Sequence, residues 1–517
     1  MATLPANPSI EQLRHQAEDL LRAAQRGDAE ALAQLEVVSD RPSLACAQLA
    51  LAREYGQPSW PALTAEVERR TRSWEQTVAT FLTASIGGRL GRAARLLSEA
   101  PALARDSYAT ALVLGDADRV AAELAADPAA ATRPDPSTRW TPLHAACSSR
   151  WHADPVRAEG LLRTVTVLLD AGADPVGTTP ERSQRTPLRC AIASATAGTG
   201  NEPILRLLLD RGAKVADHDL YLAGFAAAPA RCVSLLLEHV PDAAETAEQA
   251  LAAPISTGDS EVVRLLLEAG ADPGRYRNDN GDPAAPIPAA LAADASLEIV
   301  ELLLAHGADA DAPGPDGRPP LRLAAALGRR DVAALLTRYG AADTTTALDR
   351  LVDAVWHADH DSARRRVAAD PGLLDDLAPA DAAVLVRATD AGNADAVRLM
   401  VDLGFPLDAR SETDDGATAL HAAAYTGNAE LVALLIDRGA DVEARDASWN
   451  ATPLDWALVG SGRRPREDGD WQATVDTLLD AGASTDEITL DPDDPKAPSP
   501  DIVQLLRARG IGPQRGN

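Results

Sequence analysis

The strongest constraint on this 517-residue chain is that its sequence repeats itself. The clearest copy, residues 418–441, opens with Thr-Ala-Leu-His and closes with Arg-Gly-Ala-Asp. Endings that contain Gly, usually followed by Ala, recur along the chain at Gly172, Gly212, Gly270, Gly307, Gly340, Gly404 and Gly482. Gly307 and Gly340 lie 33 positions apart, and larger steps accommodate insertions or less regular units. A basal period of this length predicts stacked helix-turn-helix units.

Local chemistry supports two helices in each unit. The opening Thr is suited to cap the first helix, and a Pro directly after it occupies a position where a missing N–H costs nothing. The closing Gly can take a positive φ and end the second helix. A single helix pair cannot bury its apolar face, so we expect each unit to be stabilised by its neighbours and the two ends of the stack to be polar outside.

Composition fits such a stack and argues against several classes of partner. Hydrophobic residues make up 46% of the chain but aromatic residues only 3%, which suits close packing of helices through small side chains. The net charge of −28 disfavours binding to nucleic acid or to an anionic membrane surface. No apolar run approaches the roughly 18 residues of a membrane span. The first residues lack an apolar signal segment, so we expect a cytoplasmic protein.

The four cysteines, Cys46, Cys147, Cys190 and Cys232, lie at irregular spacing in helical patterns and include no Cys-x-x-Cys pair. We interpret them as buried thiols in a reducing compartment. Of the 49 basic residues only Lys214 and Lys496 are lysines. The excess of Arg and Ala is typical of a GC-rich bacterial genome.

The order of Thr-Pro-Leu-His, an inter-helix Gly, a Val-x-x-Leu-Leu helix and Gly-Ala-Asp resembles the ankyrin repeat. The resemblance is good over residues 137–343 and 380–485 and loose over most of the remainder. It implies an all-α solenoid of ankyrin type, built from helix-turn-helix units with short hairpin tips and helical caps. Residues 48–63 resemble an N-terminal helical segment of uncharacterised bacterial ankyrin-repeat proteins, a likeness that carries no known chemistry.

We predict four parts of the chain. Residues 1–75 form an N-terminal helical cap region, and residues 76–343 form an ankyrin-repeat array whose first two units are degenerate. Residues 344–498 form a second array that begins with a degenerate unit, and residues 499–517 form a C-terminal capping helix and tail. The degenerate units have Asp-Pro as a stop, at Pro128 and Pro371. We expect a bend or a flexible seam at residues 344–346.

No enzyme signature is visible. The sequence lacks the phosphate-binding, dinucleotide-binding and nucleophile-elbow motifs, and we expect no cofactor. His144 and His421 stand at the fourth position of the repeat motif, where the family resemblance implies a structural hydrogen-bonding role. His357 and His360 lie at an inter-helix turn, which favours a solvated turn over a metal site.

Departures from the repeat pattern indicate where a partner protein binds, because the resemblance implies binding through hairpin tips and inner helices. Exposed aromatic side chains are the usual anchors of interfaces. Trp140 and Trp449 fall at predicted hairpin tips, Trp151 lies in a predicted insertion at 148–160, and Tyr425 lies on a first helix. Asp455 replaces the motif His, and Trp456 follows it. The candidate partner-binding residues are therefore Trp140, Trp151, Tyr425, Trp449, Asp455 and Trp456. The alternative is that these aromatic residues are scattered and pack on their own loops.

A second set of substitutions suggests a different class of function. Arg189, Tyr221 and Arg322 replace the motif His, and Arg387 follows it in the unit at 380–410. Together they suggest an anion-binding groove in an enzyme or small-molecule sensor, unless each Arg pairs with a neighbouring carboxylate. We favour a protein–protein interaction scaffold or adaptor, and expect a basic patch on its partner because the chain is so acidic.

Overall fold

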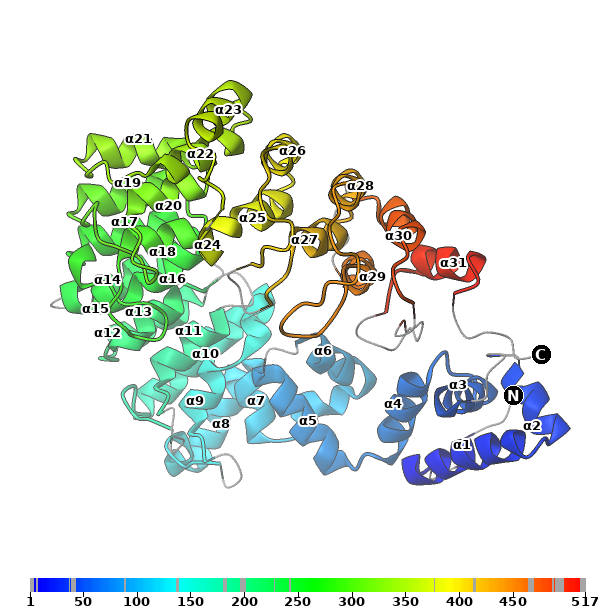
Figure 1. The fold of residues 1–517 in the computed structure, drawn as a ribbon. Coiled ribbons are helices and arrows are strands. Elements are labelled where there is room, and N and C mark those ends of the chain that lie inside the picture. Colours follow the sequence, from blue (N-terminus) through cyan, green and yellow to red (C-terminus); the bar gives the residue numbers. More distant parts are fainter. Residues whose placement is uncertain are drawn as a thin grey trace. The chain divides into compact units, whose positions relative to one another are not determined.

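The computed structural model describes residues 4–5, 8–36, 38, 43–87, 90–135, 139–179, 184–195, 201–226, 228–240, 243–375, 377–411, 415–463, 469–485, 488 and 497–511. Within these residues the secondary structure is helical, apart from two isolated β-bridges, Arg277–Pro283 and Arg410–Thr418 (Figure 1). The predicted all-α class is therefore confirmed. None of the described helices is both long and apolar enough to cross a bilayer.

The chain divides into two compact units, unit one (Met1–Pro283) and unit two (Ala284–Asn517). The predicted arrays were divided instead at residues 343 and 344, and that grouping of the repeats stays a prediction.

Unit one begins with four helices, α1 (Ile10–Gln25), α2 (Ala29–Glu36), α3 (Leu44–Glu54) and α4 (Trp60–Thr71). They share a hydrophobic core that includes Leu13, Leu51 and Leu63. Ser59 accepts a 3.3 Å hydrogen bond from the backbone N–H of Ala62, as expected of the N-cap of α4.

The remainder of unit one is a series of short helices joined by turns. They are α5 (Trp74–Ile86), α6 (Leu90–Glu99), α7 (Tyr108–Leu114), α8 (Ala117–Ala126), α9 (Pro142–Cys147), α10 (Pro155–Asp170), α11 (Pro187–Ala195), α12 (Glu202–Asp210), α13 (Asp217–Ala223), α14 (Pro229–Leu237), α15 (Ala243–Ala250), α16 (Ala252–Thr257) and α17 (Ser260–Glu268). Short 3₁₀ helices lie between them at η1 (Pro101–Arg105), η2 (Pro128–Ala131), η3 (Arg150–Ala153) and η4 (Pro273–Arg275).

These helices stack in two rows. The row of first helices is α7, α9, α11, α13 and α15, each packed on the next, and the row of second helices is α8, α10, α12, α14 and α17. Figure 1 shows the pairs following one another from cyan to green. Leu143 of α9 and Leu188 of α11, both residues of the motif, are fully buried. The expected stabilisation by neighbouring units is therefore visible in the packing.

Unit two continues with the same kind of helix pair. Its helices are α18 (Pro286–Ala292), α19 (Leu297–Ala305), α20 (Pro320–Ala326), α21 (Arg330–Arg338), α22 (Ala347–Trp356), α23 (His360–Ala369), α24 (Pro379–Ala382), α25 (Val384–Asp390), α26 (Ala394–Leu403), α27 (Ala419–Tyr425), α28 (Ala429–Asp437), α29 (Pro453–Arg463), α30 (Trp471–Asp480) and α31 (Pro500–Ala508). First helices α25, α27 and α29 pack in one row, and second helices α26, α28 and α30 pack in another.

Residues 344–346 lie between α21 and α22. Both sides of this position belong to unit two, and α20 packs on α22. Trp356 Nε1 donates a 2.9 Å hydrogen bond to the carbonyl oxygen of Ala326, and the Trp356 ring lies against Gly328. The packed junction between α20 and α22 lies beside residues 344–346, and the expected bend or flexible seam there stays a prediction.

Candidate partner-binding surface

Each motif histidine forms a hydrogen bond from its own repeat to the hairpin tip of the next repeat. His421 Nδ1 accepts hydrogen bonds from Thr418 N at 3.2 Å and pairs with Thr418 Oγ1 at 2.8 Å, while Nε2 donates to the carbonyl oxygen of Ala451 at 3.1 Å. His144 lies in the same way between Thr141 Oγ1 and the carbonyl of Arg185, at 2.7 and 3.0 Å. Burial lowers the pKa of both imidazoles, which keeps them neutral. The predicted structural role of these histidines is confirmed.

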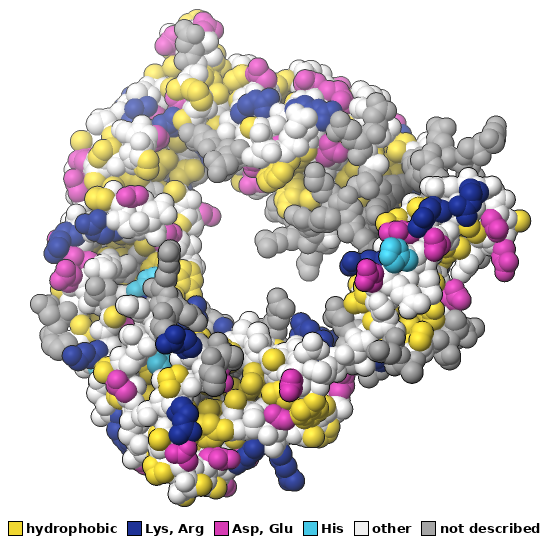
Figure 2. Space-filling view, turned by 90° about the horizontal axis from the view of Figure 1, so that it is seen from below, with side chains coloured by type: hydrophobic (Ala, Val, Ile, Leu, Met, Phe, Trp, Pro, Cys, Tyr) yellow, Lys and Arg dark blue, Asp and Glu magenta, His cyan; other side chains and the backbone are white. Residues whose placement is uncertain are grey.

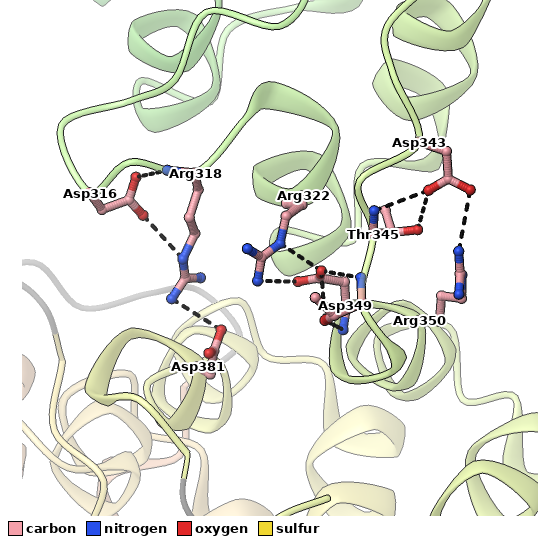
Figure 3. Close-up of polar contacts among 9 residues, drawn as sticks. Asp316, Arg318, Arg322, Asp343, Thr345, Asp349, Arg350 and Asp381 are labelled. Carbon is pink, nitrogen blue, oxygen red and sulfur yellow. Dashed lines mark hydrogen bonds and ion pairs between the residues drawn. The ribbon is translucent and has the colours of Figure 1, made fainter.

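The two arginines that replace the motif His are paired with buried carboxylates. Arg189 Nε lies 2.8 Å from Asp219 Oδ1, and Arg322 Nε lies 2.7 Å from Asp349 Oδ2. Side chains of these aspartates are only 1% and 3% exposed. The hydrogen bond to Asp349 raises the pKa of Arg322 despite partial burial. Figure 3 shows Arg322 directed at Asp349.

The other two residues of the predicted anion groove also have neighbours in the fold. Tyr221 Oη lies 3.4 Å from Asp279 Oδ1, and Arg387 Nη2 donates to the carbonyl oxygen of Ala380 at 3.2 Å. An anion at Arg189 or Arg322 would have to displace a buried carboxylate, which is costly. The alternative reading, that each of these two arginines pairs with a carboxylate next door, is the one that the geometry supports.

Two of the predicted aromatic anchors lie in unit one, and they differ in exposure. Trp151 is only 6% exposed: its Nε1 donates a 3.0 Å hydrogen bond to Ser85 Oγ, and Arg157 covers its ring at 4.7 Å. The insertion at 148–160 is correspondingly folded into η3 and the start of α10. Trp140 is half-buried, and its carbonyl oxygen accepts a hydrogen bond from Asp135 N at 2.9 Å. Trp151 is therefore excluded from the candidate surface by its burial.

In unit two, the structure brings Tyr425, Trp449 and Trp456 together. Trp456 on α29 lies at the centre, with ring centroids 5.6 Å from Tyr425 of α27 and 6.0 Å from Trp449 of the hairpin tip. Both pairs are edge-on, with interplanar angles of 74° and 61°, a favourable aromatic arrangement. Trp449 is 60% exposed, so the cluster offers a large apolar surface to solvent.

Asp446 holds this cluster in place, although its position in the repeat pattern did not single it out. Its carboxylate accepts hydrogen bonds from Trp449 N at 2.6 Å, from Ala451 N at 3.2 Å and from Trp456 Nε1 at 2.8 Å. Burial alone would raise the pKa of Asp446, but these hydrogen bonds outweigh it and lower the pKa below its ordinary value. The available signal was an Asp six residues before the capping Thr452, a spacing shared by Asp135 and Thr141.

Asp455 borders the same cluster and caps its own helix. Its Oδ2 accepts from Thr452 N at 2.8 Å and from Thr452 Oγ1 at 2.9 Å. Asp349 makes the equivalent pair of contacts with Thr346 in α22. An Asp at the position of the motif His therefore serves as a cap of its own helix. We call Tyr425, Trp449, Trp456, Asp446 and Asp455 the aromatic tip surface.

Hydrogen bonds join neighbouring hairpin tips next to this surface. Arg410 Nη1 donates to the carbonyl oxygens of Gly416 and Arg445, both at 2.8 Å. Arg445 Nη1 in turn donates to the carbonyl oxygen of Asn450 at 2.8 Å. Asn450 has a φ of 53°, which the tip stabilises through these contacts. The tip that carries Trp449 is therefore fixed by hydrogen bonds before any partner arrives.

Within the described ranges, no group of three or more His, Cys, Asp or Glu side chains is arranged to hold a metal ion. His357, one of the pair considered for such a site, directs Nδ1 to the carbonyl oxygen of Asp353 at 2.8 Å.

Comparison with known proteins identifies the repeats. Residues 351–486 match the family model described as ankyrin repeats, in three copies. No curated protein matches the chain. Among solved structures, the human ASB11 ankyrin repeat domain is 21% identical, with 45% of this chain and 98% of that chain covered and a TM-score of 0.24. The ankyrin repeat domain of Bcl-3, a member of the IkappaB protein family, is 21% identical, with 50% and 97% covered and a TM-score of 0.22. The chain therefore contains ankyrin repeats, matched over residues 351–486, in an all-α fold of stacked helix pairs.

Proposed function

We propose that this chain is a scaffold or adaptor that binds a partner protein through the aromatic tip surface of unit two. The observation that carries the proposal is the position of Trp449, which is 60% exposed yet held by the hydrogen bond from its own backbone N–H to Asp446. Ankyrin repeats are in general protein-interaction modules, which agrees with this proposal.

Two physical arguments support Trp449 and its neighbours as anchors. Trp and Tyr dominate the energetics of interfaces, and in this chain aromatic residues are only 3% of the sequence. Three of them nevertheless gather on one surface. The hydrogen bonds of Asp446, Arg410 and Arg445 fix the backbone of the tip, so little conformational entropy is lost when a partner binds.

The charge of the chain defines the partner that we propose. Asp446 and Asp455 border the rings, and the chain as a whole carries a net charge of −28. Acidic and basic side chains are interspersed on the face shown in Figure 2, so the acidity is spread over that face. We therefore propose a partner with a basic patch, whose association weakens as salt screens the attraction. We also propose a cytoplasmic location, in keeping with four cysteines that form no disulfide bond in the described part of the chain.

The test is affinity capture from the native host with the full chain. Trp449→Ala is expected to lose a partner that the wild-type chain captures. Tyr339→Ala is the matched control, because Tyr339 is also exposed, at 40%, but lies outside the aromatic tip surface. A set of captured proteins that is identical for all three chains would refute the proposal.

A further inference from the structure

A second group of rings lies in unit one, on helix α13 and in the turn that follows it. His218, Tyr221 and Phe225 follow one another at helical spacing. The rings of His218 and Tyr221 are stacked with centroids 5.3 Å apart and 22° between their planes. Tyr221 and Phe225 are edge-on, also 5.3 Å apart. We call these three residues the ring ladder.

The opposite side of α13 explains why the ladder faces outward. Asp219, Leu220 and Ala223 are at most 1% exposed and pack into the stack. Asp219 accepts from Ala216 N at 2.9 Å and pairs with Arg189 on the preceding first helix. With this side fixed, His218 is exposed and Phe225 is 42% exposed. Packing within the stack therefore does not account for the apolar rings of the ladder.

A carboxylate stands at the edge of the ladder. Asp279 lies in the tip between η4 and the end of unit one, and its Oδ1 is 3.4 Å from Tyr221 Oη. Asn278 Oδ1 fixes this tip by accepting from the backbone N–H groups of Asn280 and Asp282, both at 3.0 Å. Burial and the charge of Asp279 both raise the pKa of Tyr221, so the Tyr221 hydroxyl stays protonated beside an anion. The site combines aromatic faces with one negative charge.

We propose that the ring ladder and Asp279 form a second binding surface, whose occupant is a protein segment with an arginine next to an apolar residue. The planar guanidinium stacks on an aromatic face and donates to a carboxylate at the same time, a combination that favours Arg over Lys. In this arrangement Tyr221 and Asp279 bind the arginine, and Phe225 contacts the apolar residue next to that arginine. The complementary charge is supplied by Asp279 in a chain that is acidic overall.

This inference is independent of the function proposed for unit two. It rests on residues of unit one alone, and it implies that one chain engages two basic segments. The experiment must therefore first remove binding at the aromatic tip surface by substitution. Loss of binding at one surface then cannot be mistaken for loss of binding at the other.

The test uses the full chain carrying Trp449→Ala and ligand-observed NMR. The probe is the peptide acetyl-Gly-Leu-Arg-Leu-Gly-amide, compared with the same peptide in which the arginine is replaced by neutral, isosteric citrulline. We expect the arginine peptide to bind about threefold more tightly than the citrulline peptide, the size of an exposed cation–π contact. Adding Asp279→Asn should reduce this preference, because the carboxylate partner of the guanidinium is lost, and adding Phe225→Ala should weaken the binding of both peptides.

Controls must show that the variants remain folded and that the effect is specific to the ring ladder. Phe225 is exposed and Asp279→Asn preserves shape, so neither change needs to disturb the fold, which circular dichroism can verify. Tyr339→Ala, an exposed aromatic residue of unit two, should leave binding of both peptides unchanged. Equal binding of the arginine and citrulline peptides would overturn the proposal. Binding that survives both Asp279→Asn and Phe225→Ala would also overturn it.

Discussion

Trp456 Nε1 donates a 2.8 Å hydrogen bond to Asp446 Oδ2, and this contact links a first helix to the hairpin tip that precedes it. Asp446 is only 4% exposed, whereas Trp449, three residues later, is 60% exposed. A buried carboxylate thus positions an exposed ring. The candidate surface depends on Asp446 as much as on the aromatic residues that were evident in the sequence.

Asp446→Ala should loosen the tip. Three N–H groups lose their acceptor, and an unmade hydrogen bond of a buried donor costs about 1–3 kcal/mol. We expect hydrogen exchange at the Trp449 and Ala451 amides to become at least about tenfold faster. Asp441→Ala is the control, because Asp441 is exposed and its carboxylate accepts a hydrogen bond from Glu443 N. Equal exchange in both variants would contradict the role given to Asp446.

Acid should weaken the repeats through their motif histidines. The pKa of His144 and that of His421 are lowered by burial, and protonation of Nδ1 would remove the acceptor used by Thr141 or Thr418. A histidine with a folded-state pKa below its unfolded value of about 6.5 contributes stability that is complete above that pH and lost as pH falls through the folded pKa. NMR titration of the two imidazoles should give midpoints below about 6.5. A midpoint above that value for either ring would contradict the assignment.

Arg322→Ala should destabilise unit two even without any ligand. The change leaves Asp349, whose side chain is 3% exposed, without its cation, and breaking a mostly buried pair of this kind costs about 2–3 kcal/mol. Arg330→Ala is the comparison: Arg330 pairs with Asp353, but the side chains are 50% and 30% exposed, so a loss of about 0.5 kcal/mol is expected. Urea unfolding measures both. If Arg322→Ala were neutral or stabilising in the absence of ligand, the arginine would be free for an anion, as the alternative function requires.

Gly328→Ala should disturb the junction near residue 344. Gly328 has a φ of 66°, and a Cβ there would lie 2.8 Å from the Trp356 ring. Gly340→Ala isolates the backbone cost, because Gly340 also has a positive φ, 89°, but a Cβ would meet open space. We expect a loss of about 1 kcal/mol at Gly340 and a clearly larger loss at Gly328. Equal shifts of the urea midpoint would show that the ring contact contributes nothing.

The features that could be predicted from the sequence are those set by a residue's position within the repeat. The helix pairs and the structural histidines both follow from residues at fixed positions of neighbouring repeats. The Arg322–Asp349 pair was left open between an anion groove and a neighbouring carboxylate, because only the structure shows that Asp349 is buried beside it.

What the sequence could not predict depends on contacts outside that register. Trp151 was expected to be exposed in a loop, but η3 turns its ring inward to Ser85, 66 positions earlier. Arg318 reaches Asp381 at 3.0 Å across an intervening unit, a contact visible in Figure 3 that no single repeat encodes. The ring ladder escaped notice because Tyr221 was considered alone, without His218 and Phe225.

The most direct measurement of the central proposal is the dissociation constant of the captured partner, determined by calorimetry for the wild-type chain, Trp449→Ala and Tyr339→Ala at about 50 mM and about 300 mM NaCl. An exposed Trp that anchors an interface contributes at least about 2 kcal/mol, so Trp449→Ala should weaken binding about 30-fold, and higher salt should weaken wild-type binding. Tyr339→Ala should bind as the wild type does. Binding by Trp449→Ala within about twofold of the wild type, or an affinity unchanged by salt, would contradict the account.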